Sequence, residues 1–126
     1  MNKKILLVDD EKEAFETVGR YLMPRGFDIV PAFDGDEGLS KFDSEQPDLI
    51  LCDIKMPKKD GFEFLKDLRA TRRWVPVIII SALTEPDNIM RGYGFEAEYY
   101  LTKPLNLEKL LRSVNVMLSL SPLRKK

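Results

Sequence analysis

Four short strand-forming runs in this chain each end at polar residues of the types used in catalysis and metal binding. The runs and the residues that follow them are 5–8 before Asp9-Asp10, 49–52 before Asp53, 77–80 before Ser81, and 99–102 before Lys103-Pro104. Continuous apolar runs of this length are typical of strands that helices bury on both faces of a parallel sheet. The carboxyl ends of parallel strands meet at one edge, where open α/β sheets bind ligands. We therefore expect these polar side chains to converge on one small site.

Amphipathic segments alternate with the runs and predict a fold. Helical spacing of apolar residues predicts helices over 11–23, 37–42, 62–68, 86–93 and 105–120, and β-forming residues predict a further strand over 27–32. Five strands alternating with five helices predict an α/β fold, the flavodoxin-like doubly wound (βα)5 three-layer sandwich with parallel strand order 2-1-3-4-5. That order places the first and third strands side by side, which would bring Asp9, Asp10 and Asp53 together.

Length and composition limit the class of protein. At 126 residues and 44% hydrophobic, the chain fits one domain, expected over residues 1–121 with a short tail over 122–126. Its 20 basic and 21 acidic residues nearly cancel, so no overall field favours nucleic acid or a membrane surface. No apolar run is long enough for a membrane span or a secretion signal, and the single Cys52 fits a buried core position. We expect a cytoplasmic protein that neither inserts into membranes nor binds nucleic acid.

Histidine is absent from the sequence. The chain therefore supplies no Ser-His-Asp triad, no histidine general base, no HExxH metal site and no histidine phosphate carrier of its own. Carboxylate, hydroxyl and lysine chemistry remain.

Three neighbouring carboxylates repel one another unless they share a cation. Mg²⁺ suits such a site because it takes oxygen ligands, keeps several waters and is commonly bound by one or two carboxylates together with a phosphate oxygen. A nearby lysine and serine, here Lys103 and Ser81, would supply a charge and a hydrogen bond to other phosphate oxygens. The pattern predicts phosphoryl transfer to a carboxylate, which would form an acyl phosphate.

Each of these residues taken alone has a simpler interpretation. Asp9-Asp10 is also typical of a helix start, Asp53 of a turn, Ser81 of a helix cap and Lys103-Pro104 of an ordinary loop. Their occurrence at successive strand ends favours the functional interpretation.

The ordered motifs resemble the receiver domain of bacterial response regulators in two-component signalling, in its single-domain, chemotaxis-Y-like form. The resemblance covers essentially the whole chain and rests on the acidic pair, the block 53–61 (Asp-Ile-Lys-Met-Pro-Lys-Lys-Asp-Gly), Ser81-Ala82 and the block 100–104 (Tyr-Leu-Thr-Lys-Pro). Where the family commonly has Gly-Ala-Asp before the fifth strand, this chain has Glu-Ala-Glu over 96–98. The surface after the fourth helix is expected to differ accordingly.

The resemblance implies roles for individual residues. Asp53 would accept a phosphoryl group from a phosphohistidine of a sensor histidine kinase or a histidine phosphotransfer protein. Mg²⁺, with Mn²⁺ as a substitute, would be bound by Asp10, Asp53 and the backbone carbonyl of Lys55, with Asp9 acting through a metal-bound water. The remaining implied residues are Ser81 and Lys103 as phosphoryl contacts, Ser81 and Tyr100 as the switch, and a cis peptide at Lys103-Pro104.

The same resemblance implies a signalling phosphoacceptor rather than a classical enzyme. Phosphorylation would change the face formed by the fourth helix, fifth strand and fifth helix. A downstream protein would bind this face, or a dimer would form on phosphorylation. Tyr100 is preferred over Tyr99 as the switch aromatic because of its spacing to Lys103, and Lys55 is expected to influence dephosphorylation.

Three other functions are alternatives to this interpretation. A non-phosphorylated receiver-like interaction module would share the fold. A Mg²⁺-dependent aspartyl phosphatase of the haloacid dehalogenase type needs a second acid two residues after the nucleophile, where this chain has Lys55. A flavodoxin-like electron carrier needs a phosphate-binding first loop, which is acidic here. Within the same family, a receiver that belongs to a longer regulator or a hybrid kinase is a further alternative; the sequence ends after its fifth predicted helix, so no output domain is expected within it.

Overall fold

The computed structural model describes residues 2–56, 59–71, 73–82 and 99–124. In chain order the elements are β1 (Lys3–Val8), α1 (Lys12–Leu22), the 3-10 helix η1 (Met23–Arg25), β2 (Phe27–Ala32), α2 (Gly35–Glu45), β3 (Leu49–Asp53), α3 (Gly61–Ala70), β4 (Val77–Ala82), β5 (Tyr99–Lys103) and α5 (Leu107–Arg124). The helix predicted over 86–93 and the Glu-Ala-Glu segment over 96–98 lie outside the described residues.

The strands form one parallel sheet in the order β2-β1-β3-β4-β5. This confirms the predicted topology, including the contact between the first and third strands. In that contact Leu7 lies opposite Leu51 and Val8 opposite Cys52, so the two strands end at the same level. Asp9 and Asp53 therefore leave the sheet side by side.

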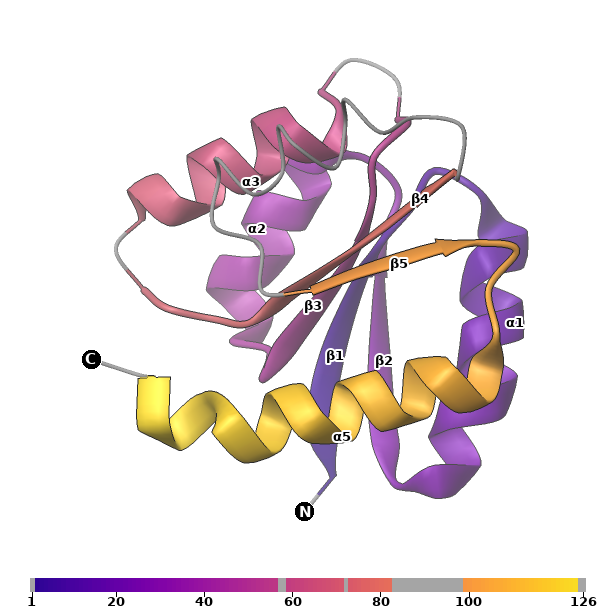
Figure 1. Cartoon of the computed structure of the whole chain (residues 1–126). Coiled ribbons are helices and arrows are strands. Elements are labelled where there is room, and N and C mark those ends of the chain that lie inside the picture. The colour runs from indigo at the N-terminus through magenta and orange to yellow at the C-terminus, as the bar shows by residue number, and fades with distance from the viewer. Residues whose placement is uncertain (1, 57–58, 72, 83–98, 125–126) are drawn as a thin grey trace.

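Helices cover the sheet on both faces (Figure 1). Helices α2 and α3 lie on one face, whereas α1 and α5 lie on the other. Successive strand residues alternate between the two resulting cores, as the pleat of a strand requires. Ile50 and Cys52 of β3, for example, pack on the α2 and α3 side, and Leu49 and Leu51 pack on the α1 and α5 side.

The two helices on the α2 and α3 side begin at aspartate caps. Asp34 accepts a hydrogen bond from the Glu37 backbone N–H at 2.8 Å, and Asp60 accepts one from the Glu63 N–H at 2.9 Å. The Glu63 side chain returns a contact to the Asp60 N–H, which completes a capping box. These caps satisfy N–H groups that a helix start leaves without intrahelical partners.

The predicted bounds of two helices, α2 and α5, lie furthest from those in the structure. Helix α2 begins at Gly35 rather than 37 because the Asp34 cap starts it immediately, and it continues to Glu45 before Gln46 takes a left-handed φ of 48°. Helix α5 continues to Arg124, past the residue where the tail was expected to start.

Among the helices that the structure describes, none combines the length and the apolar character that a bilayer crossing demands.

Core packing yields the first prediction. Leu68 of α3 is fully buried, so Leu68→Ala should lower the free energy of unfolding by about 2–5 kcal/mol through lost apolar burial and a cavity. Urea unfolding followed by circular dichroism measures the change. Val116→Ala is the control: its side chain on α5 is 50% exposed, and its effect should stay within about 0.5 kcal/mol. Equal losses in both variants would contradict the assigned core.

Candidate functional site

Asp9 and Asp10 follow the last residue of β1. The backbone N–H of Asp9 donates to the Ala32 carbonyl at 2.9 Å, which extends the pairing of β1 with β2 by one residue. One oxygen of the Asp9 carboxylate accepts from the Glu11 N–H at 2.9 Å. Asp9 is buried and Asp10 is exposed, so the pair presents one carboxylate inside the fold and one toward solvent.

Asp53 is the last residue of β3 and is only 4% exposed. Its Oδ1 atom accepts from the Ile54 backbone N–H at 3.0 Å and lies 3.2 Å from Nζ of Lys103. Lys103 ends β5, where it lies opposite Ala82 of β4. Two strands that are not neighbours in the sheet thus bring a carboxylate and an ammonium group into contact at the same edge.

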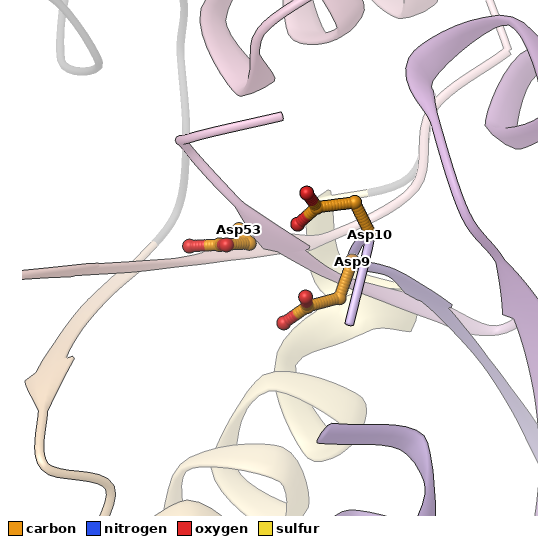
Figure 2. Close-up of side chains that lie close together, drawn as sticks. All are labelled: Asp9, Asp10 and Asp53. Carbon is orange, nitrogen blue, oxygen red and sulfur yellow. The ribbon is translucent and has the colours of Figure 1, made fainter. Parts of the chain in front are cut away.

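The three aspartates form one cluster. Each offers a carboxylate oxygen, and these oxygens all lie within 4.8 Å of one another. Figure 2 shows Asp9 and Asp10 beside Asp53, with their carboxylates grouped in one space. The predicted convergence of these residues is therefore present in the structure.

Burial dominates the electrostatics of this cluster. Desolvation raises the pKa of Asp9 from 3.8 to about 6, against the opposing Glu11 hydrogen bond and with a contribution from Asp53. Desolvation also raises the pKa of Asp53, although Lys103 opposes the shift by its charge and its hydrogen bond. Burial, the largest single influence, would lower the pKa of Lys103, but the charge and hydrogen bond of Asp53 together with the charges of Asp9 and Glu11 outweigh it, and the pKa is raised. The lysine is held protonated while the carboxylates lack a full counter-charge.

This donor set fits a hard divalent cation. Oxygen ligands from three carboxylates suit Mg²⁺, and an ion there would replace the hydration that burial removes. Ile54, which is buried, is the first residue after β3, and Lys55 follows it. The backbone carbonyl of Lys55 therefore belongs to the second residue after Asp53. Metal binding at an acidic pocket is a property of receiver domains that this cluster can support.

The two predicted switch residues lie on β4 and β5. Ser81 is 3% exposed near the end of β4. Tyr100 lies opposite Ile79, is half-buried and packs against the core on the α2 and α3 side. The Lys103-Pro104 peptide is cis, as the resemblance implied. Cys52 is fully buried and burial raises its pKa, which agrees with a core thiol.

Gly61 has a role in the site that the sequence interpretation missed. Its N–H donates to the Ile54 carbonyl at 2.8 Å, closing the loop that leaves β3. A Cβ at this position would lie 2.5 Å from the Asp53 carbonyl oxygen, so only glycine allows the approach. The signal available in the sequence was the Asp60-Gly61 pair followed by Glu63, which indicates a turn running into a capped helix.

A cavity of about 240 Å³ opens beside the cluster. Its lining includes Asp9, Glu11 and Thr17 on the α1 side and Lys103 and Pro104 at the end of β5. The cavity gives access to the edge of the sheet that carries the acidic cluster.

The fold and site together define an α/β domain with a five-stranded parallel sheet that carries an acidic cluster and a lysine at its carboxyl edge. Residues 5–115 match the family described as response regulator receiver domain. The chain belongs to this family.

Relatives and solved structures agree. The chain is 40% identical over 119 residues to the alkaline phosphatase synthesis transcriptional regulatory protein PhoP of Bacillus subtilis, covering 94% of this chain and 49% of PhoP. It is 41% identical over 120 residues to the transcriptional regulatory protein CiaR of Streptococcus pneumoniae, with 94% and 52% covered. The Francisella response regulator 1452 receiver domain superposes with a TM-score of 0.87 at 36% identity, covering 94% and 98%. The chain spans about half the length of these two curated relatives.

The raised pKa of Asp9 predicts a stability that falls with pH when no divalent ion is present. A carboxyl group that binds its proton more tightly in the folded protein stabilises it fully below about pH 4, and this contribution is lost as the pH rises through about 6. Asp9→Asn should therefore raise the free energy of unfolding by roughly 2 kcal/mol at about pH 7 and change it little at about pH 4. Urea unfolding in EDTA at both pH values measures the difference. A variant less stable than wild type at the higher pH would refute it.

Proposed function

We propose that the chain receives a phosphoryl group on Asp53 from a phosphohistidine of a sensor histidine kinase or a histidine phosphotransfer protein. The observation that carries this proposal is the buried carboxylate of Asp53, 3.2 Å from the Lys103 ammonium and grouped with the other two aspartates. A cavity lined by Asp9 and Lys103 lies at the same edge of the sheet, beside the cluster.

In the proposed step, a carboxylate oxygen of Asp53 attacks the phosphorus atom. A new P–O bond forms while the P–N bond to the donor imidazole breaks, and the bonding pair returns to that ring nitrogen, which can then take up a proton. Lys103 neutralises charge on the phosphoryl oxygens, and Ser81 contacts another of them. Mg²⁺ bound by Asp10, Asp53 and the Lys55 carbonyl, with Asp9 acting through water, would offset the remaining negative charge.

Lys103 also keeps Asp53 ready for this role. The nucleophile must be ionised, whereas burial raises its pKa. The lysine opposes that shift through its charge and hydrogen bond, and a bound cation would act in the same direction. The group that later contacts the phosphoryl oxygens thus first favours the reactive form of the carboxylate.

The proposed output is a change of surface. An aspartyl phosphate adds charge and acceptor oxygens that can attract the Ser81 hydroxyl. Tyr100, half-buried against the core, would then move into the space vacated, which alters the face that includes β5 and α5. The effect is a shift between two conformations, limited by how much better the phosphoryl group fits one of them.

We propose a signalling domain that assists its own phosphorylation rather than a classical enzyme. Relatives named as transcriptional regulators favour a downstream target in gene regulation, reached through a protein contact or a phosphorylation-dependent dimer. Direct binding of nucleic acid by this domain is not part of the proposal.

Phosphorylation can be tested by intact mass. Wild-type protein incubated with acetyl phosphate and Mg²⁺ should gain one phosphoryl group, and Asp53→Asn should gain none because its amide is not a nucleophile of this kind. Asp28→Asn, an exposed acid of β2, is the matched control and should behave as wild type. Full labelling of Asp53→Asn would remove Asp53 from its role, and a wild type unlabelled by acetyl phosphate or a phosphohistidine donor would favour the non-phosphorylated interaction module.

The metal part of the proposal predicts stabilisation by Mg²⁺. An ion that binds only the folded chain stabilises it by about 1.4 kcal/mol at about ten times its Kd. Thermal unfolding with MgCl₂, compared with NaCl at equal ionic strength, separates binding from screening. The double variant Asp9→Asn/Asp10→Asn should lose most of the difference. An equal response of wild type to both salts would contradict the metal site.

A further inference from the structure

Lys59 links three elements on the α2 and α3 side of the molecule. It belongs to the loop between β3 and α3, and its side chain is 22% exposed. Its Nζ lies 3.1 Å from Oδ1 of Asp36, near the start of α2, and it also pairs with the carboxylate of Asp67 in α3. Both hydrogen bonds raise the pKa of the lysine, so it stays charged. One side chain thus bridges two helices from the loop.

Gly35 provides the space that this bridge crosses. A Cβ at Gly35 would lie 2.8 Å from Cδ and 2.9 Å from Cγ of Lys59. These atoms belong to the middle of the lysine side chain, so an added methyl group would displace the whole side chain rather than its tip. The absence of a side chain at the first residue of α2 therefore leaves room for the Lys59 side chain.

The same loop leads to the proposed metal site. Its two ends are joined by the Gly61 N–H to Ile54 carbonyl hydrogen bond at 2.8 Å, and Lys55 follows Ile54 immediately. Met56, the next residue, packs against the α2 and α3 core. Lys59 adds a second attachment, from the α3 end of the loop to Asp36 and Asp67 on the two helices.

We infer that Lys59 is a positioning residue for metal binding: by fixing the β3 to α3 loop against α2 and α3, it holds the Lys55 carbonyl where the ion needs it. The inference rests on the proposed function, because it concerns the same metal site. Ion pairs as exposed as these contribute little to global stability. The main effect of losing Lys59 therefore falls on metal affinity.

The sign of the effect separates positioning from simple electrostatics. Removing a positive charge from the neighbourhood of a cation site would, through the field alone, strengthen binding of the cation. Loss of a positioning contact weakens it instead, because the carbonyl is no longer held in place. Groups that support ligands from outside the coordination shell commonly change metal affinity by about 10- to 100-fold, and a more distant anchor should have a smaller effect, about 3- to 10-fold.

The test is the Kd for Mn²⁺, measured from the electron paramagnetic resonance signal of the free ion. Lys59→Met should raise the Kd about 3- to 10-fold, and Lys59→Arg, which keeps the charge, should recover part of the loss. Lys4→Met is the matched control, because Lys4 makes a similar ion pair with Glu45 at 3.1 Å but lies near the start of β1. Its Kd should equal that of wild type.

A double-mutant cycle gives an independent measurement. Gly35→Ala should weaken Mn²⁺ binding by displacing Lys59, and it should add less in a Lys59→Ala background, where Cγ and Cδ are gone and only the contact with Cβ at 3.1 Å remains. Tight binding by wild type together with an unchanged or lower Kd in Lys59→Met would overturn this inference and leave the proposed metal site intact. A wild type that binds no Mn²⁺ or Mg²⁺ would overturn both.

Discussion

The burial of two neighbouring carboxylates is the constraint on which the functional edge of this protein depends. Asp9 and Asp53 are nearly inaccessible to water, and burial raises the pKa of both. A fold would ordinarily avoid such an arrangement, since unpaired buried charges are costly. Here Lys103 compensates part of the charge of Asp53 and leaves an excess of negative charge that a divalent cation would offset. Without a bound cation the buried negative charge is therefore energetically unfavourable, and a site of this kind suits a switch because ligand binding changes its energy.

The sheet makes this arrangement feasible. Asp9 and Asp53 leave adjacent strands at the same level, and Lys103 reaches them from β5, which is separated from β3 by β4. Because the strands are held in register by two well-packed cores, the small distances at the edge follow from packing far from it. The energy that holds the aspartates together comes from the apolar runs that precede them.

The sequence allowed a good prediction of this edge for a physical reason. Runs buried on both faces are visible as continuous apolar segments, and parallel topology then brings their ends together. Helix bounds were less accessible, because Gly35 is a poor helix former and only the Asp34 cap makes the earlier start favourable. The Lys59 bridge could not be predicted, since its partners Asp36 and Asp67 lie on separate helices whose relative position depends on the whole fold.

The alternation of strand side chains has a further consequence for how a signal would travel. Asp53 lies opposite Ile80, which packs on the α1 and α5 side, whereas Tyr100 lies opposite Ile79 on the α2 and α3 side. Ser81, one residue after Ile80, falls on the Tyr100 side by the same alternation. In the proposed switch, a bond made to Asp53 would begin on one surface of the sheet, and its effect on Tyr100 would fall on the opposite surface. The hydrogen-bonded sheet separates these two surfaces, and the proposed conformational change would pass from one to the other at the carboxyl edge of the strands.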